Sequence, residues 1–305
     1  MNISKKIPVI LLLISTAALA KYSSQISISR TADCIKITSN GIPDHNPGTF
    51  PNSHNPNTIS EQNYSFCVPA NPKIAGAITE LGHDLFGIAI NGVVFDPETA
   101  EYWHNDRNSG WNFDALAGGV DLGMDSNNAH VQPGGAYHYH GLPYELLANQ
   151  EKEKQTAFIG FAADGFPIYS CCTAGNNLKS SYRVKEGYRE SGPGGKYNGY
   201  YNADYEYVKG AGDLDQCNGT YGVTKEYPKG TYYYVITKEF PNIPRCFKGT
   251  PDSSFKKQMG RGRGRNPMGA GDQNQNQYYQ KYRPSSNGRR PPPPRRSGYS
   301  YPPEF

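Results

Sequence analysis

The chain has 305 residues, with 31 Lys and Arg against 27 Asp and Glu, and its formal net charge is +4. The charge is divided unevenly, because residues 251–305 carry 11 basic and 3 acidic side chains, whereas residues 21–250 carry 18 basic and 24 acidic ones. After residue 20 no segment stays apolar over the roughly 20 residues that a membrane helix needs, which excludes an integral membrane span.

The first 20 residues have the layout of a secretory signal peptide. Lys5 and Lys6 precede an apolar run over residues 7–19, and Ala18-Leu19-Ala20 provides the small residues of a cleavage site. Cleavage after Ala20 predicts a secreted mature protein, either periplasmic or extracellular.

The chain contains six cysteines: Cys34, Cys67, Cys171, Cys172, Cys217 and Cys246. An even number in an exported chain favours disulfides over free thiols. Cys34 with Cys67 and Cys217 with Cys246 are the local pairings to expect first. For the adjacent pair Cys171 and Cys172 a strained mutual bond, separate partners or a redox-active pair are open, and the strained bond is less favoured.

Residues 21–250 are expected to form a single, mainly β domain, because no linker-like segment interrupts them. Short segments rich in aromatic and β-branched residues recur between Gly, Asn, Asp and Pro, as is typical of strands. They are residues 35–38, 85–90, 93–95, 136–140, 158–162, 166–169 and 232–237. One short helix is expected at residues 143–156. The prediction is a β-rich domain of short antiparallel strands with long loops.

Hairpins are indicated at three places in this segment. Asn91-Gly92 and Asp164-Gly165 each lie between two apolar runs and predict two-residue type I′ turns. Between residues 128 and 140 a three-residue loop over residues 133–135 would put His130 opposite His138. A two-residue loop would instead turn His130 to the other face.

With the three-residue loop, His130, His138 and His140 share one face of the hairpin, because residues two apart on a strand point to the same side. Three imidazoles match a zinc or copper site with an open position for water or another ligand. The simpler alternative is an aromatic strand whose histidines are hydrogen-bonded or solvated. Weaker candidate ligands elsewhere are His45, His83, Asp84 and His104.

Asp164 is a weak candidate for a catalytic acid or base, because local hydrogen bonding in its turn explains it well. Asp213, Asp215 and Asn218 alternate like calcium ligands but lack the twelve-residue loop of an EF-hand. The motifs of common hydrolases, nucleotide-binding proteins and zincins are absent from the sequence.

Residues 251–305 contain runs of Arg-Gly, Gln-Asn and Pro-Arg with almost no aliphatic residues. Such a basic segment cannot bury enough apolar surface to fold, so a disordered Arg/Gly/Pro/Gln-rich tail is expected. Its charge suits an anionic cell-surface polymer, with nucleic acid as a less favoured partner. A solubilising or wall-spanning extension is an equally good interpretation.

Tyr137-His138-Tyr139-His140 resembles the signature of the YHYH domain family. The stretches at residues 40–45, 90–95, 163–169, 214–219 and 240–246 are also similar to blocks of that family. The resemblance covers most of residues 40–250 and implies an exported bacterial-type domain, but it brings no defined activity. Function must therefore be argued from the residues.

Two functions follow from these observations. The first is an exported metal-binding domain with a three-histidine hairpin site, in which an open coordination position would permit hydrolytic or redox chemistry. The second is a non-catalytic surface module that binds glycans or anionic polymers through tyrosines and the basic tail. The sequence does not decide whether the protein is an enzyme.

Overall fold

The computed structural model describes residues 23–152, 157–173 and 176–257. The described residues from 23 to 256 belong to one compact unit. The expected signal peptide and nearly all of the expected tail lie outside the described residues. Among the residues that are described, no helix has the length and apolar character to cross a membrane.

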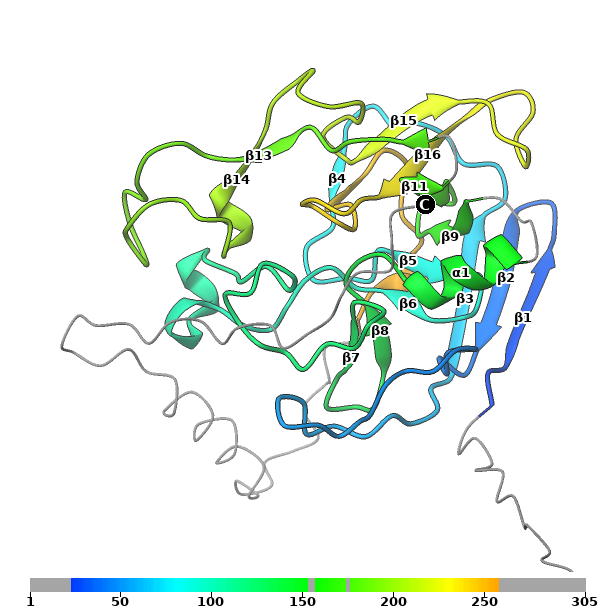
Figure 1. Cartoon of the computed structure of the whole chain (residues 1–305). Coiled ribbons are helices and arrows are strands. Elements are labelled where there is room, and N and C mark those ends of the chain that lie inside the picture. The colour runs from blue at the N-terminus through cyan, green and yellow to red at the C-terminus, as the bar shows by residue number, and fades with distance from the viewer. Residues whose placement is uncertain (1–22, 153–156, 174–175, 258–305) are drawn as a thin grey trace, which may run out of the picture. The chain divides into compact units, whose positions relative to one another are not determined.

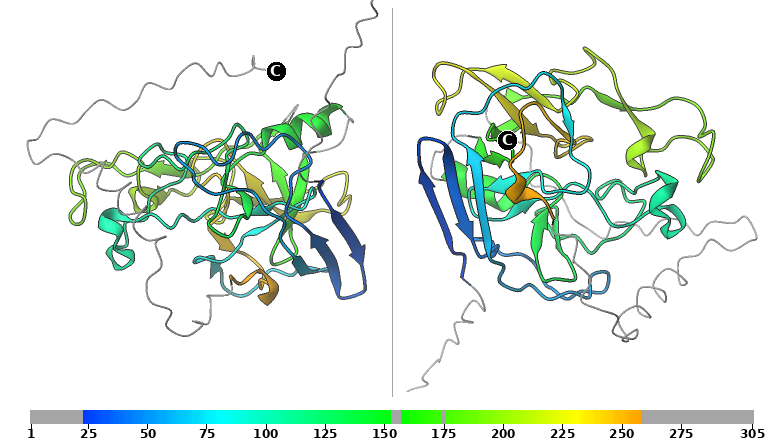
Figure 2. Two further views of the ribbon diagram at one scale, coloured as in Figure 1. Left: turned by 90° about the horizontal axis from the view of Figure 1, so that it is seen from below. Right: turned by 180° about the vertical axis from the view of Figure 1, so that it is seen from behind.

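A three-stranded antiparallel sheet begins the fold. Its strands are β1 (Ile26–Arg30), β2 (Cys34–Ser39) and β3 (Tyr64–Pro69), and they lie in chain order (Figure 1). The loop that joins β2 to β3 is long, because it includes the Asn- and Pro-rich residues 41–57. This loop runs beside the hairpin of β7 (Ala129–Val131) and β8 (Tyr137–Tyr139) (Figures 1 and 2).

The main sheet has eight strands, in the spatial order β15 (Gly219–Gly222), β16 (Thr231–Ile236), β10 (Pro167–Ser170), β9 (Phe158–Ala162), β5 (Gly87–Ala89), β6 (Val94–Phe95), β8 (Tyr137–Tyr139) and β7 (Ala129–Val131). The mainly β prediction is confirmed. The sheet is nevertheless mixed, because β6 pairs with β8 and β10 with β16 in parallel. These pairings join segments far apart in the chain, so local turn signals could not predict them.

Three hairpins of this sheet have the same loop. The amides of Gly92, Gly135 and Gly165 each donate to the carbonyl three residues earlier, and the three glycines have φ between 80° and 87°. This is a three-residue loop that ends in a G1-bulge glycine. The prediction for Gly135 is confirmed. The type I′ turns expected at Asn91-Gly92 and Asp164-Gly165 are wrong, because Asn91 and Asp164 do not have positive φ.

The remaining elements are short. The helix α1 spans Tyr144–Lys152, and residues 153–156 of the expected helix lie outside the described residues. Three two-stranded pairs are β4 (Thr79–Glu80) with β17 (Cys246–Phe247), β11 (Cys172–Thr173) with β12 (Asn176–Asn177), and β13 (Tyr182–Val184) with β14 (Tyr205–Tyr207). Four 3-10 turns span Trp103–Asn105, Arg107–Ser109, Asn202–Asp204 and Ser253–Phe255.

The start of the tail was expected at residue 251, which is too early. Phe255 is 1% exposed and stacks on Phe66 of β3, with 4.2 Å between the ring centroids. The Phe255 carbonyl also accepts a hydrogen bond from the Leu85 amide. The Asp252 amide donates to the Ala163 carbonyl, and the Ser254 hydroxyl accepts from the Cys67 amide, so residues 252–255 pack on the body. The average composition of residues 251–305 does not reveal this short segment.

All six cysteines are paired. Cys34–Cys67 links β2 to β3, and Cys217–Cys246 links the segment before β15 to β17, so both expected local pairings are confirmed. The adjacent Cys171 and Cys172 are bonded to each other, which corrects the expectation that this strained bond is the less favoured arrangement. Both residues lie at the junction between β10 and β11. The other four cysteines, all in the described part of the chain, are already paired with one another.

The core is shared by the two sheets. Ile37 and Val68 of the three-stranded sheet belong to the same buried cluster as Ile88 and Phe95 of the large sheet. Its largest fully buried side chains include the tyrosines Tyr137, Tyr139 and Tyr234. Buried tyrosines need partners for their hydroxyls, and those partners define the surroundings of the candidate site.

Candidate metal centre

The hairpin of β7 and β8 positions the three candidate histidines. The backbone pairs His130 with His138, and the Gln132 amide donates to the Ala136 carbonyl at 3.0 Å. This is the register that the three-residue loop predicts. The His140 amide then donates to the Asn128 carbonyl, which extends the hairpin by one pair. All three imidazoles therefore project from one face.

The three rings converge through the same ring nitrogen. His140 Nε2 lies 2.9 Å from His138 Nε2 and 3.2 Å from His130 Nε2. The ring centroids are 4.6 to 4.9 Å apart. Within residues 23–152, 157–173 and 176–257, this is the one group of three or more His, Cys, Asp or Glu side chains close enough to share an ion.

Backbone carbonyls set the tautomers of two of these rings. His138 Nδ1 lies 3.1 Å from the Ala136 carbonyl oxygen, and His130 Nδ1 lies 3.1 Å from that of Leu122. A carbonyl only accepts, so both Nδ1 atoms carry the hydrogen and both Nε2 atoms offer a lone pair to the centre. Fixing a ligand ring through its outer nitrogen is typical of metal-binding histidines.

His140 differs, because its buried Nδ1 has no hydrogen-bond partner of normal geometry. Without a bound ion, its hydrogen is best placed on Nε2, where it can donate to His138. A cation at the centre would take the place of this hydrogen. The arrangement therefore suits either a hydrogen bond between buried histidines or a metal ion. A hydrogen bond needs two of these nitrogens, whereas all three Nε2 atoms point to the same place.

Burial keeps the rings of His130 and His140 neutral. Desolvation lowers the pKa of His130 to about 3, with a further contribution from His138. Desolvation also holds the pKa of His140 well below its usual range, and both neighbouring histidines add to this. Neutral imidazole is the form that binds metals, so protons compete little for these two nitrogens at neutral pH.

The opposite face of β8 carries Tyr137 and Tyr139, and both hydroxyls are bonded. Tyr137 donates to Asp125 Oδ2 at 2.5 Å. The Tyr139 hydroxyl lies 2.6 Å from His45 Nε2 and accepts from Asn91 Nδ2 at 2.9 Å. His45, the first of the weaker candidate ligands, is therefore bonded to a tyrosine on the face away from the three histidines.

The geometry and the sequence lead to one family. The family model described as YHYH protein matches residues 65–249, which include both arms of the hairpin and all three histidines. The chain belongs to the YHYH protein family. No curated protein and no solved structure matches the chain. The block at residues 40–45, which supplies His45, precedes the range of the YHYH match.

The other weaker candidates of this YHYH protein lie apart from the centre. His83 Nε2 is 2.8 Å from the Tyr102 hydroxyl, and Asp84 follows it outside the three-histidine group. His104 is exposed and stacks on Trp103, with 3.9 Å between the ring centroids. The structure brings none of these three side chains to His130, His138 and His140.

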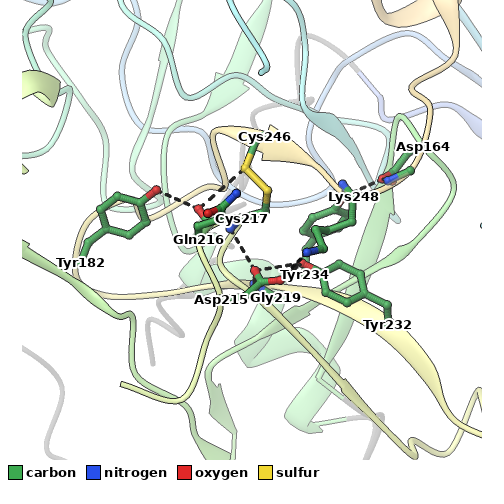
Figure 3. Close-up of a disulfide and its surroundings, with 11 residues drawn as sticks. Asp164, Tyr182, Asp215, Gln216, Cys217, Gly219, Tyr232, Tyr234, Cys246 and Lys248 are labelled. Atoms are coloured by element: carbon green, nitrogen blue, oxygen red, sulfur yellow. Dashed lines mark hydrogen bonds and ion pairs between the residues drawn. A yellow bond between two sulfur atoms is a disulfide. The ribbon is translucent and has the colours of Figure 1, made fainter. Parts of the chain in front are cut away.

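Asp164 is buried and has a structural explanation. Its Oδ2 accepts hydrogen bonds from the Tyr234 hydroxyl at 2.6 Å and from the Gly249 amide at 2.8 Å (Figure 3). Burial raises its pKa to about 6 in spite of these donors. Asp164 thus connects β16 to the segment after β17, and its described contacts do not include the three histidines.

Sequence analysis missed Asp96, a fully buried carboxylate directly after β6. Its Oδ2 accepts a hydrogen bond from Gln132 Nε2 at 2.8 Å, and its charge raises the pKa of His130. The signal available in the sequence was an acidic residue at the end of an apolar run. The acidic residue could be related to the histidines only once the parallel pairing of β6 and β8 was known.

Proposed function

We propose that this YHYH protein is an exported metal-binding domain whose centre is His130, His138 and His140, with Zn²⁺ or Cu²⁺ as the ion. The observation that carries the proposal is the approach of three Nε2 atoms from one hairpin face, with His140 Nε2 at 2.9 and 3.2 Å from the other two. Neutral imidazoles suit both ions. Met124 is the one methionine among residues 21–250, which argues against a methionine-based Cu(I) carrier.

Three protein ligands leave one coordination position for water or a substrate, which is the arrangement of catalytic zinc sites. The ion would act there as a Lewis acid and lower the pKa of a bound water. His138 and His140 are 1% and 3% exposed, so the ligand at that position must be small. The protein thereby qualifies as a candidate metalloenzyme for a small substrate.

Metal analysis of the purified mature protein tests the centre directly. We expect a stoichiometric ion in the natural chain and its loss in the double variant His138→Ala/His140→Ala. His83→Ala is the matched control, since it removes a histidine that is bonded to Tyr102 and lies outside the centre. Equal metal content in the natural chain and the double variant would dismiss the site.

Export is supported by the signal-like residues 1–20 and by three disulfides, which persist in oxidising compartments. Expression in a host with a secretory pathway should release a protein that begins at Lys21. N-terminal sequencing of the released protein checks the cleavage site. Retention of the complete chain inside the cell would contradict it.

A second candidate function is binding to an anionic or glycan polymer. The observation in its favour is the exposure of large aromatic side chains, with Tyr221 70% and Tyr188 66% exposed. A pull-down on cell-wall material, with and without residues 258–305, tests the part played by the basic tail. Unchanged retention after the truncation would remove the tail from this function.

A further inference from the structure

The residue next to the three histidines across the sheet is Asp96. Val94 pairs with His138 and Phe95 with Tyr139 in the parallel ladder of β6 and β8. The Phe95 and Tyr139 rings lie on one face, with 5.6 Å between their centroids. Side chains alternate along a strand, so the next residue, Asp96, projects to the histidine face at the level of His140. The Asp96 amide confirms the alignment by donating to the Tyr139 carbonyl at 3.0 Å.

The hairpin holds the Asp96 carboxylate from the other side. Gln132 lies two residues after His130 and shares its face, and its Nε2 donates to Asp96 Oδ2 at 2.8 Å. Asp96 is 0% exposed. Its charge counteracts part of the burial effect on His130 and raises the pKa of Tyr64 as well. A buried carboxyl group is thus fixed beside the three histidines.

Asp96 lies outside the set of side chains that are close enough to share an ion. The Asp96 carboxyl group would have to move toward the three histidines to coordinate the ion directly. From its present position it can form a hydrogen bond with a ligand that is bound to the ion. Carboxylates accept hydrogen bonds and repel anions, and the effect is strong in a buried setting.

We propose that Asp96 accepts a hydrogen bond from the non-protein ligand at the open coordination position and so selects protic ligands, such as water or a small hydroxyl compound, over small anions. Gln132 acts as the positioning residue for Asp96. The inference rests on the proposed function and adds the class of ligand. It involves no covalent step.

Azide binding to the Co²⁺-loaded full-length mature chain tests the selectivity, because azide is a small anion and Co²⁺ reports its ligands by visible absorption. We expect weak azide binding in the natural chain and at least about tenfold tighter binding in Asp96→Asn, which keeps the shape but removes the charge. Co²⁺ content should be the same in both. Asp164→Asn is the matched control, as it neutralises a buried carboxylate bonded to Tyr234 and should leave azide affinity unchanged.

The outcomes separate the two proposals. A natural chain that binds none of Zn²⁺, Cu²⁺ and Co²⁺ overturns the proposed function, and the inference with it. Equal Co²⁺ content with equal azide affinity in the natural chain and Asp96→Asn overturns the inference alone. If Asp96→Asn does not fold, Gln132→Ala replaces it, because Gln132 is only partly buried. Loosening Asp96 in this way should tighten azide binding by a smaller factor, and an unchanged affinity overturns the inference.

Discussion

Two strands of the large sheet share a Gly-x-Tyr-x-Tyr pattern and have different surroundings. Residues 135–140 read Gly-Ala-Tyr-His-Tyr-His and include β8, whereas residues 230–235 read Gly-Thr-Tyr-Tyr-Tyr-Val and include most of β16. In both strands the two tyrosines of the Tyr-x-Tyr pattern are buried, and their hydroxyls bond to polar side chains. The strands differ in the residues that point the other way.

In β16 the two tyrosines bond to carboxylates near the Cys217–Cys246 disulfide. Tyr232 donates to Asp215 Oδ1 at 3.1 Å and Tyr234 to Asp164 Oδ2 at 2.6 Å (Figure 3). On the opposite face Tyr233 packs against Tyr169, with 5.1 Å between the ring centroids. In this strand, all three tyrosines serve packing and hydrogen bonding.

In β8 the corresponding opposite face carries His138 and His140. The tyrosine half of the YHYH motif therefore has a structural counterpart elsewhere in the chain, and the histidine half has none. The comparison assigns Tyr137 and Tyr139 to holding the strand in place and leaves His138 and His140 for the proposed metal centre. The following predictions test that division.

The largest effect is expected from removing a buried ring in either strand. Tyr139→Ala and Tyr234→Ala each delete a side chain that is 0% exposed, so each should lower the free energy of unfolding by about 3 to 5 kcal/mol. Urea unfolding measures the loss. A loss below about 1 kcal/mol in either variant would contradict an equivalent structural role for the two tyrosines.

Metal should stabilise the chain through the β7–β8 hairpin and not through β16. Zn²⁺ at about a hundred times its Kd should raise the free energy of unfolding by about 2.7 kcal/mol, because the folded state binds it. The thermal midpoint with and without Zn²⁺ measures the gain. His138→Ala should abolish it, whereas Tyr233→His, at the equivalent position of β16, should not add to it.

The carboxylates behind both strands should make stability depend on pH. Burial raises the pKa of Asp125, the partner of Tyr137, and of Asp164, the partner of Tyr234, to about 6. A raised carboxyl pKa means that the folded chain holds the proton more tightly than the unfolded chain does. This contribution is fully present below about pH 4 and is lost as the pH rises through about 6, and it amounts to about 3 kcal/mol per group.

Urea unfolding between pH 4 and pH 7.5 measures that dependence. Asp164→Asn should remove the contribution of Asp164 to the pH dependence of the free energy of unfolding and leave metal content unchanged. Asp125→Asn should remove the contribution of Asp125 in the same way. Identical curves for the natural chain and both variants would show that neither carboxyl has a raised pKa.

The smallest effect is expected from removing one hydroxyl of β16. Tyr232→Phe loses the bond to Asp215 and should cost about 1 kcal/mol in the free energy of unfolding. Tyr221→Phe is the control, since Tyr221 is 70% exposed, and it should change stability by less than about 0.5 kcal/mol. A larger loss of stability in Tyr221→Phe than in Tyr232→Phe would contradict a stabilising role for the hydrogen bond between Tyr232 and Asp215.

Local patterns predicted the parts of the centre that lie within one hairpin. Pro133-Gly134-Gly135 determined the loop length, the loop length determined the register, and the register put His130 opposite His138. Strand alternation then placed His140 on the same face. Each step used residues fewer than a dozen apart, where turn geometry dominates.

Parts that depend on distant segments could not be predicted in this way. Asp96 reaches the histidine face through the parallel pairing of β6 with β8, and His45 reaches Tyr139 from a loop 94 residues earlier in the chain. Both contacts follow from the order of strands in the sheet and not from local sequence. The bond between Cys171 and Cys172 is local, but the sequence did not show that the other four cysteines pair with one another.

The position of β7 at the end of the sheet has a further consequence. Among the described strands, β7 pairs with β8 alone, and its three residues include His130. Short outer strands are where amide hydrogens exchange fastest with solvent. An ion held between His130 and the two histidines of β8 would act as a cross-strand clip, so occupancy of the centre should be readable as slowed exchange at Ala129 and Val131.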